Sequence, residues 1–407
     1  MASEISDSKK QKTMSNTPRS QRYHIAIFGR RNAGKSSLVN AIAGQDVSIV
    51  SDYAGTTTDT VWKNIELPGV GAAVIGDTAG YDDTGELGML RIERTEAAAR
   101  RIDLAIMLLA DCCDDAAREL RWKQKFEKSG IPVIFLLGKC DSCDDTLAAS
   151  WSRILGAEVL PVSSREGRGI EALLKRVAQI YKLDDNVEDI THSLVKAGDT
   201  VVLVMPQDAQ APKGRLIQPQ VQTLRNLLDK HCLALCCAPE ELSQMLAQLQ
   251  SPPALIITDS QVFAQVRALT PQATRLTSFS VLMARHKGDI EAFRAAADIL
   301  VNLPPDAKIL IAEACSHIPQ NEDIGRVKLP RLLRKRLGVA LKIDIVSGND
   351  FPDDLSSYDI IIHCGACMFT RRHVLLRVRQ AKAQSVPITN YGIAIAALTG
   401  ILDRVVY

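Results

Sequence analysis

Three cysteines and two histidines in the C-terminal part of the chain have the types and spacing of a metal or cluster site. The run HCGAC contains His363, Cys364 and Cys367, and the earlier run CSH contains Cys315 and His317. Two cysteines separated by two residues offer soft ligands to zinc or to an iron–sulfur cluster. The spacing alone leaves three interpretations open: an iron–sulfur cluster, a zinc site of the Cys₃His type, and buried thiols without a ligand.

Each group of thiols directly follows an apolar run that is typical of a buried strand. KILIAEA precedes Cys315, and YDIIIH precedes Cys364. The carboxyl ends of parallel strands emerge along one edge of a sheet, where loops that are distant in sequence converge. We therefore expect these thiols to gather at one edge of a C-terminal sheet.

A second pattern, near the N-terminus, has the chemistry of phosphate binding. Residues 29–36 read GRRNAGKS, the GxxxxGK[ST] pattern, between an apolar run and a helical segment. Backbone N–H groups of such a loop surround the β-phosphate at a helix N-terminus. Lys35 would reach the β- and γ-phosphates, and the Ser36 hydroxyl would hold Mg²⁺. The nucleotide-binding residues expected in this loop are Asn32, Ala33, Gly34, Lys35, Ser36 and Ser37.

Two further motifs would complete a hydrolytic site. Asp77 opens the DTAG element and would approach Mg²⁺ through water, while the Gly80 N–H would meet the γ-phosphate. Thr57, in the loop GTTTD, is expected as a second Mg²⁺ ligand, although an ordinary polar surface loop is the alternative. Lys35, Thr57 and Gly80 are the expected catalytic residues.

A fourth motif selects the base. Lys139 and Asp141 lie in the run GKCD after an apolar strand, and the Asp141 carboxylate could pair with N1–H and the exocyclic amine of guanine. Adenine has no such pair of donors, so the motif predicts GTP and GDP as ligands. Ser163 and Ser164, at the end of the next strand, would close over the base.

This order of motifs resembles the small GTPases of the TrmE-Era group. The resemblance rests on GRRNAGKSS, GTTTD and SSREGRGIEAL, and it implies that Asn32 coordinates K⁺ and that K⁺ stimulates hydrolysis. Tyr81 follows DTAG where Ras-like proteins have a water-orienting Gln, so slow hydrolysis is expected. Gly138 departs from the Asn usual in the group, and losing one hydrogen bond of about 0.5–1.5 kcal/mol predicts several-fold weaker binding with guanine preference kept.

The length of 407 residues predicts several domains. Apolar runs alternate with helical patterns, which indicates α/β domains with parallel sheets. We expect a disordered tail at 1–20, a P-loop GTPase domain at 21–184, an acidic linker, a middle α/β domain at 190–277 and a C-terminal α/β domain at 278–407. Cys236 and Cys237 lie in an apolar run of the middle domain and are expected in its core.

The charge balance argues against a nucleic-acid partner. The chain has 49 Lys and Arg against 47 Asp and Glu, so it has no strong positive field. It contains no apolar stretch long enough to cross a membrane and no start typical of a secretion signal. We expect a cytoplasmic protein whose ten cysteines are thiols or metal ligands.

The thiols and the GTPase motifs together resemble the FeFe-hydrogenase maturation GTPases, the HydF family. The resemblance covers nearly the whole chain after the tail and rests on CSH, HCGAC and the run DIGRVKLPR at 323–331. It implies that Cys315, Cys364 and Cys367 hold a 4Fe-4S cluster with one exchangeable position, with His317 or His363 as a fourth or nearby ligand.

The same resemblance implies a role and partners. Such a protein would be a scaffold and carrier that receives a di-iron subcluster precursor, made with radical-SAM maturases of the HydE and HydG type, and delivers it to apo FeFe-hydrogenase. The middle domain would form a homodimer. One alternative is a TrmE-Era-like GTPase in RNA modification or ribosome assembly, with structural zinc; a nucleotide-gated electron-transfer protein is another.

Overall fold

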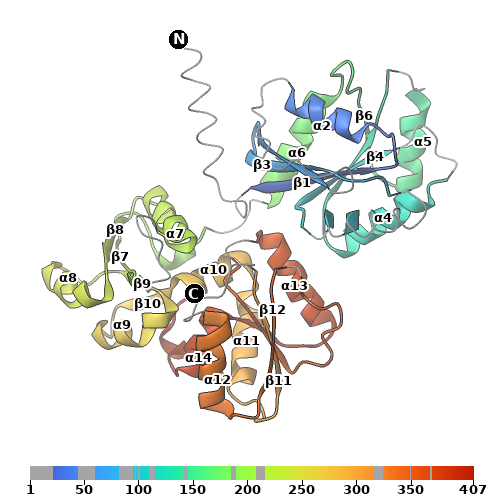
Figure 1. Cartoon of the computed structure of the whole chain (residues 1–407). Helices are drawn as coiled ribbons and strands as arrows, with labels where there is room; N and C mark the ends of the chain where they lie inside the picture. The colour runs from blue at the N-terminus through green and yellow to red at the C-terminus, as the bar shows by residue number, and fades with distance from the viewer. Residues whose placement is uncertain are drawn as a thin grey trace. The chain divides into compact units, whose positions relative to one another are not determined.

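The chain folds into two compact units that divide between Asn186 and Val187 (Figure 1). The computed structural model describes residues 22–44, 60–81, 95–96, 98–99, 101–109, 115–141, 145–184, 189–207, 216–314, 324–348, 350–366 and 369–407. The tail at 1–20, Thr57, Cys315, His317 and Cys367 lie outside the described residues. Each unit is therefore described by itself.

A six-stranded sheet in the order β2-β3-β1-β4-β5-β6 forms the centre of the first unit. Its strands are β1 (Tyr23–Gly29), β2 (Val61–Leu67), β3 (Gly71–Asp77), β4 (Leu104–Leu109), β5 (Val133–Leu137) and β6 (Val159–Pro161). The five buried runs expected as parallel strands are confirmed. The edge strand β2 pairs antiparallel with β3 and is the one strand of this sheet that the apolar runs did not predict.

Two pairs of helices cover the two faces of this sheet. Along β1, Ile25 and Ile27 pack with α2 (Lys35–Ala43) and α6 (Ile170–Asp184). The intervening Ala26 and Phe28 pack with α4 (Ala117–Lys128) and α5 (Asp145–Leu155) on the other face. Successive side chains of a strand point to opposite faces, so a strand covered on both sides is apolar throughout.

The second unit contains two four-stranded parallel sheets. The first has the order β10-β9-β7-β8 and the second has the order β12-β11-β13-β14. The strands are β7 (Thr200–Val204), β8 (Leu233–Cys237), β9 (Leu255–Thr258), β10 (Arg275–Ser278), β11 (Lys308–Ala312), β12 (Lys342–Val346), β13 (Ile360–His363) and β14 (Ile388–Asn390).

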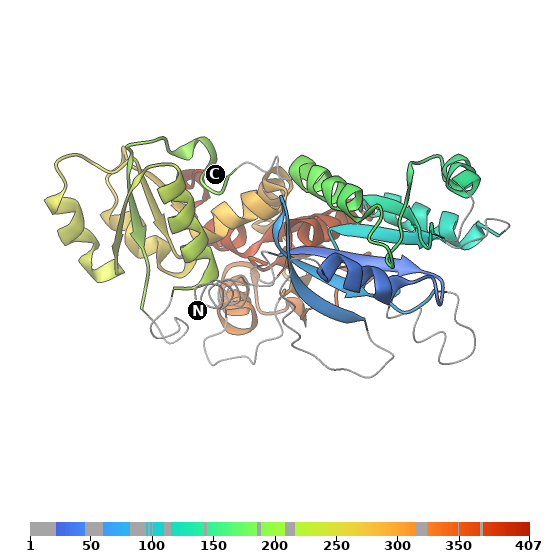
Figure 2. The same cartoon turned by 90° about the horizontal axis from the view of Figure 1, so that it is seen from above.

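Helices follow most of these strands, as expected for parallel sheets. They are α7 (Gln218–Asp229), α8 (Leu242–Gln248), α9 (Phe263–Leu269), α10 (Phe279–Lys287), α11 (Ile290–Leu300), α12 (Leu329–Leu337), α13 (Arg371–Ala383) and α14 (Tyr391–Leu398). A π-helical turn, Ile324–Lys328, leads into α12. In Figure 2 the strands of the first sheet stand between α7 on one side and α8 and α9 on the other. Among the described residues, no helix is both long and apolar enough to span a membrane.

The two sheets of the second unit share one hydrophobic core. Val202 and Ile256 of the first sheet belong to the same buried cluster as Ile309 and Ile361 of the second. The two sheets therefore pack as parts of one unit. The predicted boundary at 277/278 falls within β10, one residue before its end at Ser278.

The two edges of the first sheet differ. The C-terminal segment pairs with β10 through Leu276 and Val405, whereas β8 is the opposite edge strand. The prediction that Cys236 and Cys237 lie in the core is wrong for Cys236, which is exposed, whereas Cys237 is half-buried and packs against the core. An edge strand has one neighbour, and the apolar character of the run did not reveal that position.

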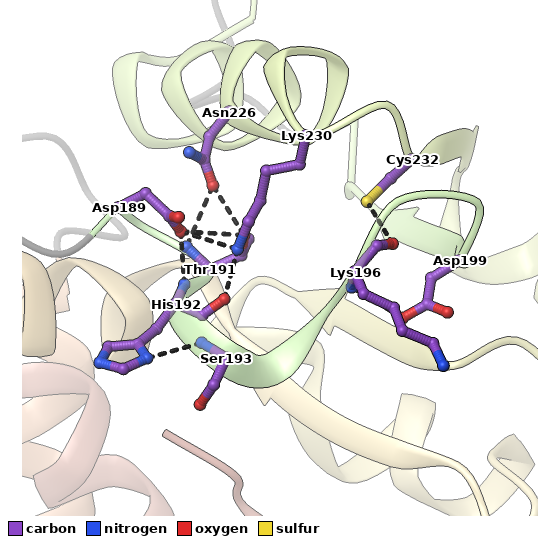
Figure 3. A network of polar contacts seen from close by, with 9 residues as sticks. All are labelled: Asp189, Thr191, His192, Ser193, Lys196, Asp199, Asn226, Lys230 and Cys232. Atoms are coloured by element: carbon purple, nitrogen blue, oxygen red, sulfur yellow. Dashed lines mark hydrogen bonds and ion pairs between the residues drawn. The ribbon is translucent and has the colours of Figure 1, made fainter.

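The start of the second unit is tied to the C-terminal end of α7 (Figure 3). Lys230 Nζ donates to Asp189 Oδ1 at 3.0 Å and also to the His192 carbonyl. The Asn226 side-chain oxygen accepts from both the N–H and the hydroxyl of Thr191, at 3.1 and 2.7 Å. The described fold of the second unit therefore begins at Asp189, the last residue of the predicted acidic linker.

Candidate functional site

The phosphate loop lies between β1 and α2, at the carboxyl edge of the six-stranded sheet of the first unit. Gly29 is required there, because an added Cβ would lie 2.7 Å from the Leu108 carbonyl oxygen. Asn32 and Gly34 have positive φ values of 58° and 99°, which turn the chain tightly into the helix. Lys35 is buried, and its Nζ donates to the carbonyl oxygens of Gly29 and Arg30.

The structure brings the two expected magnesium-binding elements together. The Ser36 hydroxyl at the start of α2 donates to the Asp77 carboxylate at the end of β3. Their hydrogen bond joins residues 41 positions apart in sequence. A hydroxyl and a carboxylate oxygen side by side are ligands that Mg²⁺ accepts. Gly80, which follows Asp77 by three residues in the sequence, is buried. Thr57 lies outside the described residues.

Tyr81 has a different role from a water-orienting residue. Its ring is buried against Trp122, and its hydroxyl donates to Glu119 Oε1 at 2.9 Å. Arg30, in the phosphate loop, donates to both oxygens of the same carboxylate, at 2.8 and 3.0 Å. This hydrogen-bonded pair with Glu119 raises the pKa of Arg30 above its usual value.

A continuous polar connection therefore links the phosphate loop, α4 and the residue after DTAG. Sequence reasoning did not find Arg30 and Glu119 as functional residues. Their contact joins positions 89 residues apart, and no spacing pattern in the sequence indicates it.

The residues predicted to bind guanine meet at the ends of β5 and β6. The Ser163 hydroxyl donates to Asp141 Oδ1 at 2.8 Å, so the carboxylate is held by the residue expected to close over the base. The Cys140 N–H donates to the Val162 carbonyl at 3.2 Å, which ties the two loops together. Lys139, with a φ of 56°, is exposed, and Ser164 is half-buried.

Gly138 packs directly against the phosphate loop. A Cβ added at Gly138 would lie 3.0 Å from Leu108 Cδ1 and 3.3 Å from the Ala33 carbonyl oxygen. Both distances are shorter than ordinary contacts. The Leu108 side chain therefore takes up part of the space that an Asn at this position would need.

The described part of the thiol site is centred on Cys364, directly after β13. Its Sγ accepts the N–H of Ala314 at 2.9 Å and the N–H of Ala366 at 3.4 Å. Ala314 directly precedes Cys315, and Ala366 directly precedes Cys367. N–H···S hydrogen bonds of this kind also surround thiolates that bind iron–sulfur clusters.

Cys315, His317 and Cys367 lie outside the described residues. Of the predicted ligand set, the structure therefore describes Cys364 and His363. Accordingly, no group of three His, Cys, Asp or Glu side chains placed to hold a metal ion occurs among the described residues. The convergence of the three thiols stays a prediction, supported by the two neighbouring N–H groups.

His363 is buried beside Cys364, and both of its ring nitrogens have partners. Arg377 Nη1 lies 3.0 Å from Nε2, and Nδ1 lies 2.8 Å from the Cys364 carbonyl oxygen. Because a guanidinium can only donate, Nε2 is the acceptor and Nδ1 carries the proton. Burial and the nearby Arg377 charge lower the pKa of His363 to about 3, so the ring is neutral.

Arg377 is itself buried, on α13. Its guanidinium lies over the rings of Phe351 and Phe369, at 4.7 and 4.6 Å from their centroids, and donates to the Gly348 carbonyl. Burial lowers the pKa of Arg377 to about 10, which still leaves the side chain charged at neutral pH. An arginine between Val374 and Val378 on the apolar face of a helix is the sequence signal that could have identified it.

Lys287 approaches the same segment from α10. Its buried Nζ donates to the carbonyl oxygens of Ala366 and Phe369, at 3.1 and 3.0 Å. The segment from Cys364 to Phe369 is therefore held at its described residues from two helices. No pattern in the sequence predicted this role for Lys287.

The described part of the run DIGRVKLPR begins with the π-helical turn Ile324–Lys328, which contacts the end of β11. Arg326 Nε donates to the buried Glu313 carboxylate at 3.1 Å, and the Ser347 hydroxyl donates to it at 3.2 Å. A Cβ on Gly325 would lie 2.1 Å from the Tyr391 hydroxyl and 2.5 Å from Glu313 Oε1. A glycine is needed because the backbone passes so close to these two side chains.

Comparisons with protein families divide the chain into three parts. A family model described as a 50S ribosome-binding GTPase matches residues 24–139. The hydrogen maturase F dimerization domain matches residues 190–288, and the hydrogen maturase F tetramerization domain matches residues 291–407. The two hydrogen maturase models together span more than half of the chain.

Individual relatives match the first part. A tRNA modification GTPase MnmE from Laribacter hongkongensis is 39% identical over 156 residues, which are 37% of this chain and 33% of the relative. Its counterpart from Chromobacterium violaceum is 35% identical over 158 residues, 39% of this chain and 34% of the relative. The chain thus matches about a third of the length of these relatives.

Solved structures of GTPases are also similar to this chain. A GDP·AlF₄⁻-bound Era variant from Aquifex aeolicus is 20% identical with a TM-score of 0.33, over 53% of this chain and 92% of that one. A GDP·AlF₄⁻-bound NFeoB variant from S. thermophilus is 21% identical with a TM-score of 0.30, over 42% of this chain and 74% of that one.

Proposed function

The chain belongs to the hydrogen maturase F family, a group of hydrogenase-maturation GTPases, and from this premise we propose that it is an iron–sulfur scaffold and carrier. In this proposal Cys315, Cys364 and Cys367 hold a 4Fe-4S cluster with one exchangeable position. The protein receives a di-iron subcluster precursor as cargo from radical-SAM maturases and delivers it to apo FeFe-hydrogenase in the cytoplasm.

One observation carries the cluster proposal: the N–H groups of Ala314 and Ala366 both donate to Cys364 Sγ. The chain positions next to the other two cysteines therefore converge on this sulfur. When bound by three thiolates, a 4Fe-4S cluster has one iron that is free to take an exchangeable ligand. The donor set of three cysteines fits such a group.

His363 orients this site rather than completing it. Its Nε2 accepts from Arg377 and its Nδ1 donates to the Cys364 carbonyl, so neither nitrogen is free to bind iron in this arrangement. We therefore assign His363 as the nearby residue that fixes the backbone of Cys364. His317 remains the proposed histidine candidate for the fourth position.

The GTPase domain supplies nucleotide binding and hydrolysis. The contact between Ser36 and Asp77 supports a Mg²⁺ ion at that point, and the contact between Ser163 and Asp141 supports guanine recognition. We propose that Asn32 coordinates K⁺ and that hydrolysis is slow, because Tyr81 is engaged with Glu119. Comparing hydrolysis rates in KCl and NaCl tests the potassium proposal, and equal rates would remove it.

We propose that the open edge of β8 forms the homodimer. Leu233 on β8 is 61% exposed, and Leu228 and Val221 on α7 are 55% and 43% exposed. An exposed apolar edge strand is a template for pairing with a second chain. Among the described residues, the opposite edge, β10, is paired by the segment at Val405 and β8 has one strand neighbour, so we propose that β8 is the edge that extends across two copies.

A charge at this edge tests the dimer. Leu233→Glu would place a carboxylate from each copy in the apolar edge that the two copies share, so it should reduce the mass measured by light scattering by half. Leu269 on α9 is also an exposed leucine, at 40%, and Leu269→Glu should leave the mass unchanged. An unchanged mass for Leu233→Glu would contradict this interface.

Anaerobic reconstitution tests the function. Protein treated with iron and sulfide should turn brown and, when loaded with the di-iron precursor, should activate apo FeFe-hydrogenase. Cys364→Ser should lose the colour and the activation but keep GTP hydrolysis. Cys236→Ser, at an exposed cysteine, should keep all three properties. A colourless protein with stoichiometric zinc would support the RNA-related alternative instead.

A further inference from the structure

Two buried cationic side chains hold the backbone at Cys364 and at the described residues that follow it. Arg377, from α13, reaches it through His363, whose Nδ1–H donates to the Cys364 carbonyl. Lys287, from α10, donates directly to the Ala366 and Phe369 carbonyls. Both side chains are almost fully excluded from solvent, with 3% and 6% exposure.

No carboxylate contacts Arg377 among the described residues. Its hydrogen-bond and ring partners are an imidazole, a carbonyl and two aromatic rings, all uncharged, and the acidic group that acts on its charge is the Cys364 thiol. The ring faces and the carbonyl hold the guanidinium in place, and burial makes its field strong because water does not screen it. Burying such a charge is costly unless an anion lies close by.

We propose that Arg377 and Lys287 are positioning residues that stabilise the negative charge of a cluster bound at Cys364 and raise its reduction potential. This inference rests on the proposed cluster function. A 4Fe-4S cluster with three thiolates is anionic, and adding one electron makes it more negative by one charge without breaking a bond. Fixed positive charges near it favour that reduced state.

The two cations come from different parts of the family architecture. Lys287 lies in the range that matches the dimerization domain, and Arg377 lies in the range that matches the tetramerization domain. Because both belong to one compact unit, their distance from Cys364 is fixed by a shared core. The cluster segment is thus set by residues of both domains.

Redox titration of the reconstituted full-length chain tests the proposal. Dithionite is the reductant, and the EPR signal of the reduced cluster is the readout. Arg377→Gln should lower the equilibrium constant for one-electron reduction of the cluster roughly tenfold. This change lowers the reduction potential by about 59 mV. Lys287→Met should shift the potential in the same direction. Arg377→Lys keeps the charge and should stay close to the wild-type potential.

Arg379 supplies the matched control, since it is an exposed arginine on the same helix. Arg379→Gln should leave the potential unchanged, and all of these variants should hydrolyse GTP at the wild-type rate. If Arg377→Gln and Arg379→Gln have the same potential, the inference is overturned. If Arg377→Gln holds no cluster, Lys287→Met decides, and a wild-type potential in that variant overturns it. A wild-type chain that takes up no cluster would instead refute the proposed function.

Discussion

Replacing Glu119 by Gln should destabilise the GTPase unit selectively. The Glu119 side chain is fully buried and accepts hydrogen bonds from Arg30 Nε, Arg30 Nη2 and the Tyr81 hydroxyl, at 2.8, 3.0 and 2.9 Å. The Gln amide keeps one oxygen for two of these donors. Its NH₂ group replaces the oxygen that accepts from Arg30 Nη2, so two donors face each other.

The magnitude follows from the charge that is lost. A hydrogen bond to a charged group contributes about 1.5–3 kcal/mol, and breaking a fully buried ion pair costs about 3–5 kcal/mol. The Arg30 side chain is 21% exposed, so water can partly solvate its freed guanidinium. We expect a loss of about 2–3 kcal/mol, which lowers the unfolding midpoint of a unit of this size by about 4–12 °C.

Tryptophan fluorescence reports this unit within the intact chain. The three tryptophans of the protein, at positions 62, 122 and 151, all belong to the first unit. Glu127→Gln is the matched control on the same helix, because Glu127 is 57% exposed in its pair with Lys123 and should contribute at most about 0.5 kcal/mol. Equal unfolding midpoints for the Glu119 and Glu127 variants would refute the reasoning.

Three further substitutions have defined outcomes. Gly138→Asn alone should change GDP affinity little because Leu108 crowds the new side chain. The double variant Gly138→Asn with Leu108→Val should bind GDP several-fold more tightly, by about 0.5–1.5 kcal/mol in calorimetry. Asp141→Asn should shift preference in competition assays from GTP toward xanthosine triphosphate, because an amide can donate to the C2 oxygen of xanthine. Gly325→Ala should cost about 1–3 kcal/mol through its clash with Tyr391, seen as an earlier circular-dichroism transition of the second unit. An unchanged affinity of the Gly138→Asn/Leu108→Val variant, an unchanged base preference of Asp141→Asn or an unchanged transition of Gly325→Ala would contradict the respective expectation.

The sequence predicted most strands because a parallel strand covered on both faces is continuously apolar. β2 was missed because the run Val61–Leu67 has exposed and half-buried positions among its buried ones. Cys236 was misplaced for the opposite reason, since β8 is apolar and yet lies at an edge. Whether an apolar strand is central or peripheral depends on its neighbours, which local composition does not encode.

The functional sites also contain residues that the sequence predicts and residues that depend on contacts with distant parts of the chain. The contact of Ser36 with Asp77 could be predicted because each residue belongs to a motif whose role fixes its position. The supporting residues could not, because Glu119 and Arg377 act through contacts with distant parts of the chain. Such partners have no fixed spacing from the residues that they hold. Sequence motifs therefore identify the residues that carry the chemistry but not the residues that hold them in place.

Anomalous diffraction at the iron edge, from anaerobically reconstituted crystals, shows directly whether the three cysteines bind one iron–sulfur cluster. We expect one cluster of iron atoms per chain, bonded to the sulfurs of Cys315, Cys364 and Cys367, with His363 still paired to Arg377. Sulfurs too far apart to share one ion, or a zinc signal in place of iron, would contradict it.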